Sequence, residues 1–218
     1  MHLGELREAH VYSLNAALAD PAAPLSWRQD LALSGFNMLT LGIVHETLTR
    51  WVPPPVRVLA QVHAHLPSRI DPESGVRRPV GTPDSVQVLA VLGNGARVTY
   101  HCSGVTPFGQ GMGIHLYGTE GVLHYDLQQD RIRGASLKRG QRAGHAGELV
   151  EIDIPAERAG RWRVEEEFVE AIRTGAPVRL TDFATGVAYM EFTEAVARSA
   201  EREEPVELPL AEFDETPG

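Results

Sequence analysis

Cysteine is nearly absent from the sequence, in which Cys102 is the only one. A single thiol forms no internal disulfide and no thiolate metal cluster, so both kinds of cross-link are excluded. Cys102 is expected to serve as a small buried apolar side chain, because a nucleophilic role would need an activating base beside the sulfur.

Basic charge and long hydrophobic runs are also scarce. The 20 Lys and Arg side chains are outnumbered by 29 Asp and Glu, which gives a net charge of −9 with the histidines neutral. Nucleic acid and anionic membranes require a basic face, so neither is expected as a partner. No run approaches the roughly 20 apolar residues of a membrane span, and the first residues lack the basic and apolar regions of a secretory signal. A cytoplasmic protein is expected.

A nucleotide-binding fingerprint is missing as well. The sequence contains no Walker motif and no complete Gly-x-Gly-x-x-Gly. The glycine-rich run Gly109–Gly113 leads into an expected strand at Ile114–Tyr117, whereas a dinucleotide fingerprint opens a helix whose N-terminus faces the pyrophosphate. No cofactor-binding residue is therefore assigned, and we predict that the chain alone binds neither NAD(H) nor NADP(H).

What the sequence does contain is a regular alternation of apolar and polar residues. With 218 residues, of which 43% are hydrophobic, it can build one well-filled core. Val56–Leu66 alternates strictly with a period of two, which predicts a half-buried strand. Strands are expected at Leu6–Leu14, Val56–Leu66, Ser85–Leu92, Arg97–Ser103, Ile114–Tyr117, Val122–Leu127 and, after a basic, Gly-rich hairpin around Lys138–Gly147, at Glu148–Ile154. Tight turns between several of them favour a largely antiparallel sheet of six or seven strands.

Helical spacing of apolar residues marks three further segments. The expected helices are Asn37–Trp51, Arg161–Thr174 and Asp182–Glu201, the last with Thr181 as its N-cap. Asp182–Glu201 has apolar residues on two sides, which predicts a central, buried helix. Three helices of this size can cover one face of the sheet. The prediction is an α+β fold in which residues 1–218 form a single domain, an open-faced, largely antiparallel or mixed sheet with helices on one face.

The other face of the sheet, the open face, is expected to be mainly polar. From the alternation it should present Arg57, Gln61, His63, His65, Gln87, Arg97, Thr99, His101, Ser103, His115 and Tyr117. Leu59, Leu89 and Val91 lie among these residues, and a face with so many apolar side chains should not stay in water over its full width. A homodimer through the open face is therefore predicted, since a second copy related by a two-fold axis is the simplest cover.

Four histidines of this face have two interpretations. His63, His65, His101 and His115 would converge on one metal ion if the strand order brought them together. Alternatively they line a polar or interface surface. No metal ligand is assigned, because the strand order does not follow from the sequence.

Several segments resemble one family of enzymes. Trp27-Arg28-Gln29-Asp30, followed by Ser34-Gly35-Phe36-Asn37 and a helix with His45 and Glu46, is similar to a pattern of the Gfo/Idh/MocA family. In that family a Trp-Arg-like stretch leads through a Gly-rich approach to a helix bearing Gly-Gly-x-x-x-Asp-x-Gly-x-His. Further family segments are similar to Asn94-Gly95-Ala96, Tyr117–Gly121 and Phe168–Gly175, so the resemblance spans almost the whole chain.

The resemblance implies a two-domain oxidoreductase. An N-terminal Rossmann domain binds NAD or NADP. A C-terminal α+β domain, like those of dihydrodipicolinate reductase and glyceraldehyde-3-phosphate dehydrogenase, shapes a sugar or polyol pocket and forms oligomers through its open sheet. The Rossmann half and the family's catalytic lysine, which stands in a Glu-Lys-Pro-type motif, have no counterpart in this sequence. Hydride transfer by this chain alone is therefore not expected, and a separate Rossmann-domain chain is a candidate partner beside a small sugar-like ligand.

The resemblance also assigns five residues to the substrate pocket. Trp27, Arg28, Asn37 and Thr40 are predicted to bind substrate, because they combine a cation with hydrogen-bonding groups, and His45 is the predicted catalytic residue. Its imidazole would protonate or hydrogen-bond a substrate hydroxyl.

The family's Asp and His pair is not recovered, which leaves an alternative for His45. Aligning His45 with the family histidine puts Leu41 at the aspartate, whereas aligning Gly42 with the family glycine puts Thr40 and Val44 at the aspartate and histidine. His45 also lies at the edge of the apolar stripe of its helix. The alternative is a buried or pocket-lining histidine without an acid–base role.

Three functions agree with these observations. The first is the substrate-binding and oligomerisation domain of an NAD(P)-dependent sugar or polyol dehydrogenase-like oxidoreductase. The second is a stand-alone, non-catalytic binding or structural dimer with the same fold. The third is a metal-binding protein that uses the histidines of the open face.

Overall fold

A large β-sheet forms the body of the protein. The computed structural model describes residues 2–137, 148–160, 163–178 and 182–213, and within them the strand order is β10-β9-β8-β7-β1-β6-β5-β2-β11. The strands are β1 (Leu6–Leu14), β2 (Pro55–His63), β5 (Ser85–Leu92), β6 (Arg97–Ser103), β7 (Gly111–Gly118), β8 (Gly121–Asp126), β9 (Arg131–Ser136), β10 (Val150–Glu151) and β11 (Val206–Glu207), while β3 (Ser68–Ile70) and β4 (Arg77–Pro79) form a separate hairpin. The pairing of β1 with β6 is parallel and the other pairings are antiparallel. The predicted mixed, largely antiparallel sheet is confirmed.

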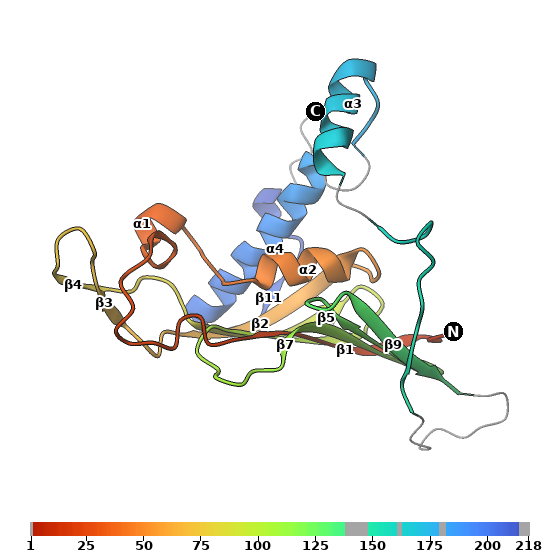
Figure 1. Cartoon of the computed structure of the whole chain (residues 1–218), viewed down its shortest axis with the longest axis horizontal. Coiled ribbons are helices and arrows are strands. Elements are labelled where there is room, and N and C mark those ends of the chain that lie inside the picture. The colour runs from red at the N-terminus through yellow and green to blue at the C-terminus, as the bar shows by residue number, and fades with distance from the viewer. Residues whose placement is uncertain (1, 138–147, 161–162, 179–181, 214–218) are drawn as a thin grey trace.

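The helices labelled in Figure 1 lie on one side of this sheet. They are α1 (Leu31–Ser34), α2 (Leu41–Thr49), α3 (Val164–Thr174) and α4 (Phe183–Arg202), and a 3-10 turn, η1 (Trp27–Gln29), precedes α1. α4 packs against β2 and β11, and α2 packs against β1, β7 and α4. The predicted α+β fold with helices on one face is therefore confirmed. None of the described helices is long and apolar enough to cross a membrane.

The core lies between the sheet and two of these helices, α2 and α4. Alternate residues of the central strands are buried, such as Val86 and Val88 of β5, and they meet Leu41 and Leu48 of α2 and Phe192 of α4 in one apolar cluster. Each fully buried Val or Leu side chain contributes roughly 1.5–3 kcal/mol to the free energy of folding. Cys102 belongs to the same cluster and is fully buried, as predicted, and burial raises the pKa of its thiol to about 11.

α2 begins four residues later than the helix predicted from Asn37. Leu39 has a φ of 60°, in the left-handed region that interrupts a right-handed helix. Asn37 stabilises the turn before it, because its side-chain Oδ1 accepts a hydrogen bond from the Leu39 N–H at 3.0 Å. The polar residues before α2 therefore form a turn.

The prediction that three helices cover the sheet is wrong for α3, which contributes no buried residue. The prediction that the last helix is buried on two sides holds only for one of them, because Phe183, Val187 and Met190 of α4 are exposed. Figure 1 shows the physical reason: α3 and the first half of α4 rise away from the sheet. The predicted N-cap Thr181 lies outside the described residues, and Asp182 caps α4 by accepting a hydrogen bond from the Thr185 N–H at 2.8 Å.

Several strands also differ from their predictions. β9 and β11 are not among the predicted strands, because Arg131–Ser136 and Val206–Glu207 lack a clear alternation of apolar and polar residues. Of the strand predicted at Glu148–Ile154, β10 contains only Val150 and Glu151. The predicted hairpin at 138–147 lies outside the described residues.

Candidate functional site

The segment with the first two predicted site residues, Trp27 and Arg28, is fixed through its backbone. The Ser26 N–H donates a hydrogen bond to Oε1 of the buried Gln29 at 3.2 Å. The carbonyl of Arg28 accepts a hydrogen bond from the Ser34 hydroxyl at 3.0 Å. These local bonds set the position of η1 independently of the exposed side chains that it presents.

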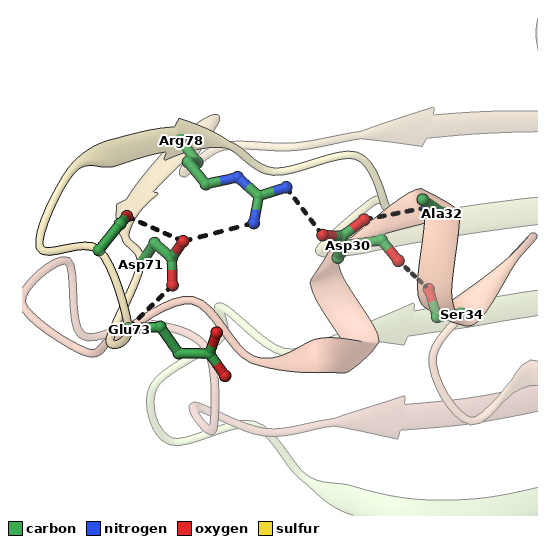
Figure 2. A network of polar contacts seen from close by, with 7 residues as sticks. Asp30, Ala32, Ser34, Asp71, Glu73 and Arg78 are labelled. Atoms are coloured by element: carbon green, nitrogen blue, oxygen red, sulfur yellow. Dashed lines mark hydrogen bonds and ion pairs between the residues drawn. The ribbon is translucent and has the colours of Figure 1, made fainter.

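A polar network joins this segment to the hairpin of β3 and β4. Figure 2 shows Arg78 reaching between two carboxylates, with its Nη2 2.9 Å from Asp30 Oδ2 and its Nη1 3.5 Å from Asp71 Oδ2. Asp30 also caps α1, because its Oδ1 accepts a hydrogen bond from the Ala32 N–H at 3.0 Å. Hydrogen bonds from the Glu73 N–H, the Ser74 hydroxyl and Arg78 lower the pKa of Asp71. Through Arg78, the hairpin is thus linked to the segment of η1 and α1.

Trp27 and Arg28 face solvent together. The Arg28 guanidinium lies 4.4 Å from the centroid of the Trp27 ring, and Trp27 remains 55% exposed. A cation over an exposed aromatic ring gains about 0.5–1 kcal/mol. The pair therefore offers a ligand an aromatic face beside a fixed positive charge.

Asn37 and Thr40 lie at the start of α2. The Asn37 side chain uses its oxygen in the turn, and its NH2 group makes no hydrogen bond within the described part of the chain. Thr40 is the N-cap residue of α2, and its hydroxyl hydrogen-bonds the thiol of Cys102. Of these two side chains, Asn37 is the one with free donors for a ligand.

His45 is a core residue that is only 2% exposed. Its Nδ1 lies 3.0 Å from the Tyr100 hydroxyl, and its ring stacks on Phe192 with centroids 3.6 Å apart. Burial lowers the pKa of His45 to about 3. The imidazole is therefore neutral at physiological pH, so it can accept or donate a hydrogen bond but is a weak base.

The five predicted residues thus come from one continuous segment, from η1 to the middle of α2, and this segment lies on the helix side of the sheet (Figure 1). Trp27 and Arg28 are exposed, Asn37 and Thr40 are partly exposed, and His45 is buried in the core. Their roles in substrate binding and catalysis stay predictions.

The open face holds polar groups that the sequence does not single out. His10, His115 and His124 share one cross-strand register on β1, β7 and β8, and only His115 is among the residues predicted for this face. His10 follows from the period of β1 and His124 from that of β8, so the alternation contains the signal. Their proximity depends on the strand order.

Two other predicted members of the open face differ in position. Ser103 is almost fully buried, and the Val105 N–H donates a hydrogen bond to its hydroxyl at 3.3 Å. His65 follows the end of β2 and lies in a turn. Both residues lie at the end of a strand, where the chain turns into a loop. The alternation within a strand does not predict where such a loop packs, so it does not predict the position of either side chain.

The described residues contain no group of three or more His, Cys, Asp or Glu arranged to hold a metal ion. His63 and His65 contact each other with ring centroids 4.5 Å apart. His101 lies 3.3 Å from the Gln87 amide, whereas His115 stacks on His124. The four histidines considered for a metal site are thus occupied in separate contacts.

Comparison with known proteins identifies relatives of the chain. Residues 2–124 match the family model of the GFO/IDH/MocA C-terminal domain. No curated protein sequence matches the chain.

Solved structures share its fold at low sequence identity. A levoglucosan dehydrogenase in complex with NADH and L-sorbose is 24% identical with a TM-score of 0.77, over 95% of this chain and 59% of that one. An oxidoreductase domain protein from Kribbella flavida is 21% identical with a TM-score of 0.77, over 95% and 60% of the two chains. A NAD binding oxidoreductase from Klebsiella pneumoniae is 18% identical with a TM-score of 0.78, over 95% and 60%. The chain therefore spans about three fifths of the length of these proteins.

Proposed function

Because the chain belongs to the GFO/IDH/MocA family as a C-terminal domain, we propose that it is the substrate-binding and oligomerisation half of an NAD(P)-dependent oxidoreductase. The proposed substrate is a sugar or polyol. Solved structures of a similar fold support this class, since levoglucosan dehydrogenase is known in complexes with NADH and either L-sorbose or levoglucosan. The dinucleotide is proposed to be bound by a nucleotide-binding domain, on the same or a separate polypeptide.

The observation that supports this proposal best is the exposed apolar stripe on the helix side. It runs along α3 and the first half of α4 and consists of Val164, Phe168, Ile172, Phe183, Val187 and Met190, all of which are exposed. The α3 members are spaced four residues apart, so they lie along one face of that helix. Exposed apolar side chains in this number mark an interaction site. We assign it to the nucleotide-binding domain, because about two fifths of each similar chain has no counterpart in this one.

Substrate binding is assigned to the segment that faces solvent on the same side. Arg28 and the NH2 group of Asn37 can donate hydrogen bonds to substrate hydroxyls, and the Trp27 ring can pack against an apolar sugar face. His45, whose pKa is about 3, is too weak a base to accept a hydroxyl proton at neutral pH. We therefore assign His45 a hydrogen-bonding role. The group that accepts the proton is assigned to the nucleotide-binding domain, where the family has its catalytic lysine.

The open face is proposed to form a homodimer. Leu89 is 58% exposed at the middle of β5, and Leu59 lies directly opposite it on β2. In the same cross-strand register lie Thr99 of β6, His10 of β1 and His115 of β7. A specific interface of this kind should bury more than about 1,000 Å², and two-fold symmetry would let one surface cover itself.

The alternative is a stand-alone dimer that binds or supports other molecules without catalysis. One observation favours this alternative. His45 is buried between Tyr100 and Phe192, where its role would be purely structural. The two functions differ in whether the chain requires a nucleotide-binding partner.

The test is co-expression of the full chain with the polypeptide that is encoded directly upstream of it. If that polypeptide has a Rossmann fold, we expect the two to co-purify and to reduce NAD or NADP with a sugar or polyol, whereas the chain alone should give no heat of NADH or NADPH binding in calorimetry. The double change Phe168→Asp and Ile172→Asp should abolish co-purification. The matched control Glu170→Ala, on the opposite side of α3, should leave it intact.

Two outcomes would contradict the proposal. Micromolar binding of NADH or NADPH to the chain alone would show that it needs no partner domain. Unchanged co-purification of the Phe168→Asp, Ile172→Asp variant would show that the partner binds elsewhere. A neighbouring region without a Rossmann reading frame would favour the stand-alone dimer.

A further inference from the structure

Three histidines form a row across the middle of the open face. His10 of β1 is in register with His115 of β7, which is in register with His124 of β8. β1 is the central strand of the sheet, with four strands on each side in the described order. Any partner that covers the open face must therefore cover this row.

Two rings of the row, those of His115 and His124, are in direct contact. His115 and His124 stack in parallel, with centroids 3.6 Å apart and planes 9° apart. Both nitrogens of His115 already have partners, because Nε2 lies 3.2 Å from the Tyr12 hydroxyl and Nδ1 lies 3.4 Å from the Tyr117 hydroxyl. His124 Nε2 is buried and has no hydrogen-bond partner in the described structure. This geometry suits neutral imidazoles, since two stacked imidazolium ions would repel each other.

The charges around the row do not favour protonation of the stacked pair. Glu8 Oε2 lies 3.8 Å from His10 Nε2, but among the described residues no carboxylate lies within 4 Å of the His115 or His124 nitrogens. Arg133 is in register with His124, and it lowers the pKa of both His115 and His124. The other titratable or charged groups that share this face on the neighbouring strands are Tyr12, Arg97, His101, Tyr117, Asp126 and Arg131.

We propose that the row of His10, His115 and His124 makes association of two copies through the open face dependent on pH. The dimer forms while the row is neutral and separates as the row takes up protons. This inference rests on the homodimer proposed above, and it names the regulation of that interface.

The direction follows from the partial burial of His115 and His124. Burial, followed by the charges of His124, His10 and Arg133, lowers the pKa of His115 to about 4 already in the single chain, and burial also lowers that of His124. A second copy would remove more water from the rings and lower both pKa values further, so association would release protons held by the free chain. The dissociation constant should therefore be constant well above the pKa values of the free chain, about 4 for His115, and rise as the pH falls through them. Each proton released changes it by about tenfold per pH unit.

The experiment is sedimentation equilibrium of the full chain between pH 7.5 and pH 4.0, with near-UV circular dichroism at each pH to show that the fold persists. For the wild-type protein we expect a dimer at pH 7.5 whose dissociation constant rises at least about fourfold by pH 4.0, because His115 is then about half protonated in each of the two free chains. The double change His115→Gln and His124→Gln should give a dimer whose dissociation constant is nearly independent of pH. The control His63→Gln, at the end of β2 and outside the row, should behave like the wild type.

The outcomes separate the two proposals. A wild-type dimer with the same dissociation constant at both pH values would overturn the pH dependence and leave the homodimer standing. A monomer at every pH and at millimolar concentration would overturn both. If the double variant does not fold, NMR titration of the wild-type histidines decides the question: lower pKa values for His115 and His124 in the dimer than in the diluted monomer support the proposal, and equal values overturn it.

Discussion

Both halves of α4 carry apolar side chains, but their surroundings are opposite. In the second half, counted from Phe192, the side chains of Phe192, Ala195 and Val196 are buried, and the Ser199 hydroxyl accepts a hydrogen bond from the Ala60 N–H of β2 at 2.9 Å. In the first half, Phe183 is 97% exposed and Val187 is also exposed. Both halves belong to one continuous helix, so the difference lies in what is packed against them. An apolar helical stripe thus predicts an interface, and the position of the sheet decides whether the interface is within the chain.

The largest expected effect is a difference in the free energy of unfolding between substitutions in these two halves. Phe192→Ala should lower the free energy of unfolding by about 3–5 kcal/mol, because it leaves a cavity in the core. Phe183→Ala should change it by less than about 0.5 kcal/mol, because its side chain contacts mainly water. Urea denaturation of both variants measures the difference. Similar losses would mean that the first half of α4 is packed within its own chain.

A second effect concerns the stability of the fold in acid, and it arises in the core around the second half of α4, where His45 of α2 stacks on Phe192. The folded-state pKa of His45, about 3, lies below the unfolded value near 6.5. His45 therefore does not lower the free energy of unfolding above pH 6.5. Below pH 6.5 it lowers this free energy by about 1.4 kcal/mol for each pH unit, down to the folded-state pKa. His45→Leu should flatten the fall of the free energy of unfolding between pH 6.5 and pH 4, measured by urea denaturation, whereas His65→Gln, an exposed control, should not. Equal slopes for wild type and His45→Leu would refute the assignment.

A third effect tests the contact between the buried half of α4 and the sheet. Ser199→Ala should cost about 1–3 kcal/mol, because the buried Ala60 N–H loses its acceptor. The matched change Thr193→Ala removes a hydroxyl that bonds only to the carbonyl of Tyr189 in its own helix, and it should cost less than about 0.5 kcal/mol. Thermal unfolding of the two variants gives the comparison. A cost for Thr193→Ala as large as that for Ser199→Ala would be inconsistent with this contact.

The smallest effect on stability is expected in the segment that contains Trp27 and Arg28, whose side chains are exposed while its backbone is held by local hydrogen bonds. Asp30→Ala removes the N-cap of α1 and one partner of Arg78 and should cost about 1 kcal/mol. Asp30→Asn keeps the cap and loses the charge, which for an exposed ion pair is worth about 0–1 kcal/mol, so it should be the milder change in thermal unfolding. The reverse order would mean that the Arg78 bridge holds the segment more strongly than the cap does.

The sequence predicts local structure where the alternation is strict. β1, β5 and β6 begin and end where the period of two predicts, and the fold class follows from the arrangement of strands and helices. The strand order does not follow, because β1 lies between strands that are about 90 and 100 residues away along the chain. The contact of His10 with the His115 region depends on that order.

The candidate site shows the same limit. The segment that contains Trp27, Asn37 and His45 is predicted from the resemblance, but the exposure of each side chain is not. The left-handed backbone of Leu39 delays the start of α2, and the Asn37 side chain accepts a hydrogen bond within the turn before it. The depth of His45 depends on Tyr100 and Phe192, which come from distant parts of the chain.

Hydrogen exchange of α3 and α4, with and without the nucleotide-binding partner, tests the central claim most directly. In the free chain we expect the amides of α3 and of the first half of α4 to exchange much faster than those of the second half, because no packing within the chain opposes their opening. Addition of the partner should protect α3 and the first half of α4 and leave the second half unchanged. Equal protection of both halves in the free chain, or no added protection of α3 in the complex, would contradict the claim that this stripe receives the nucleotide-binding domain.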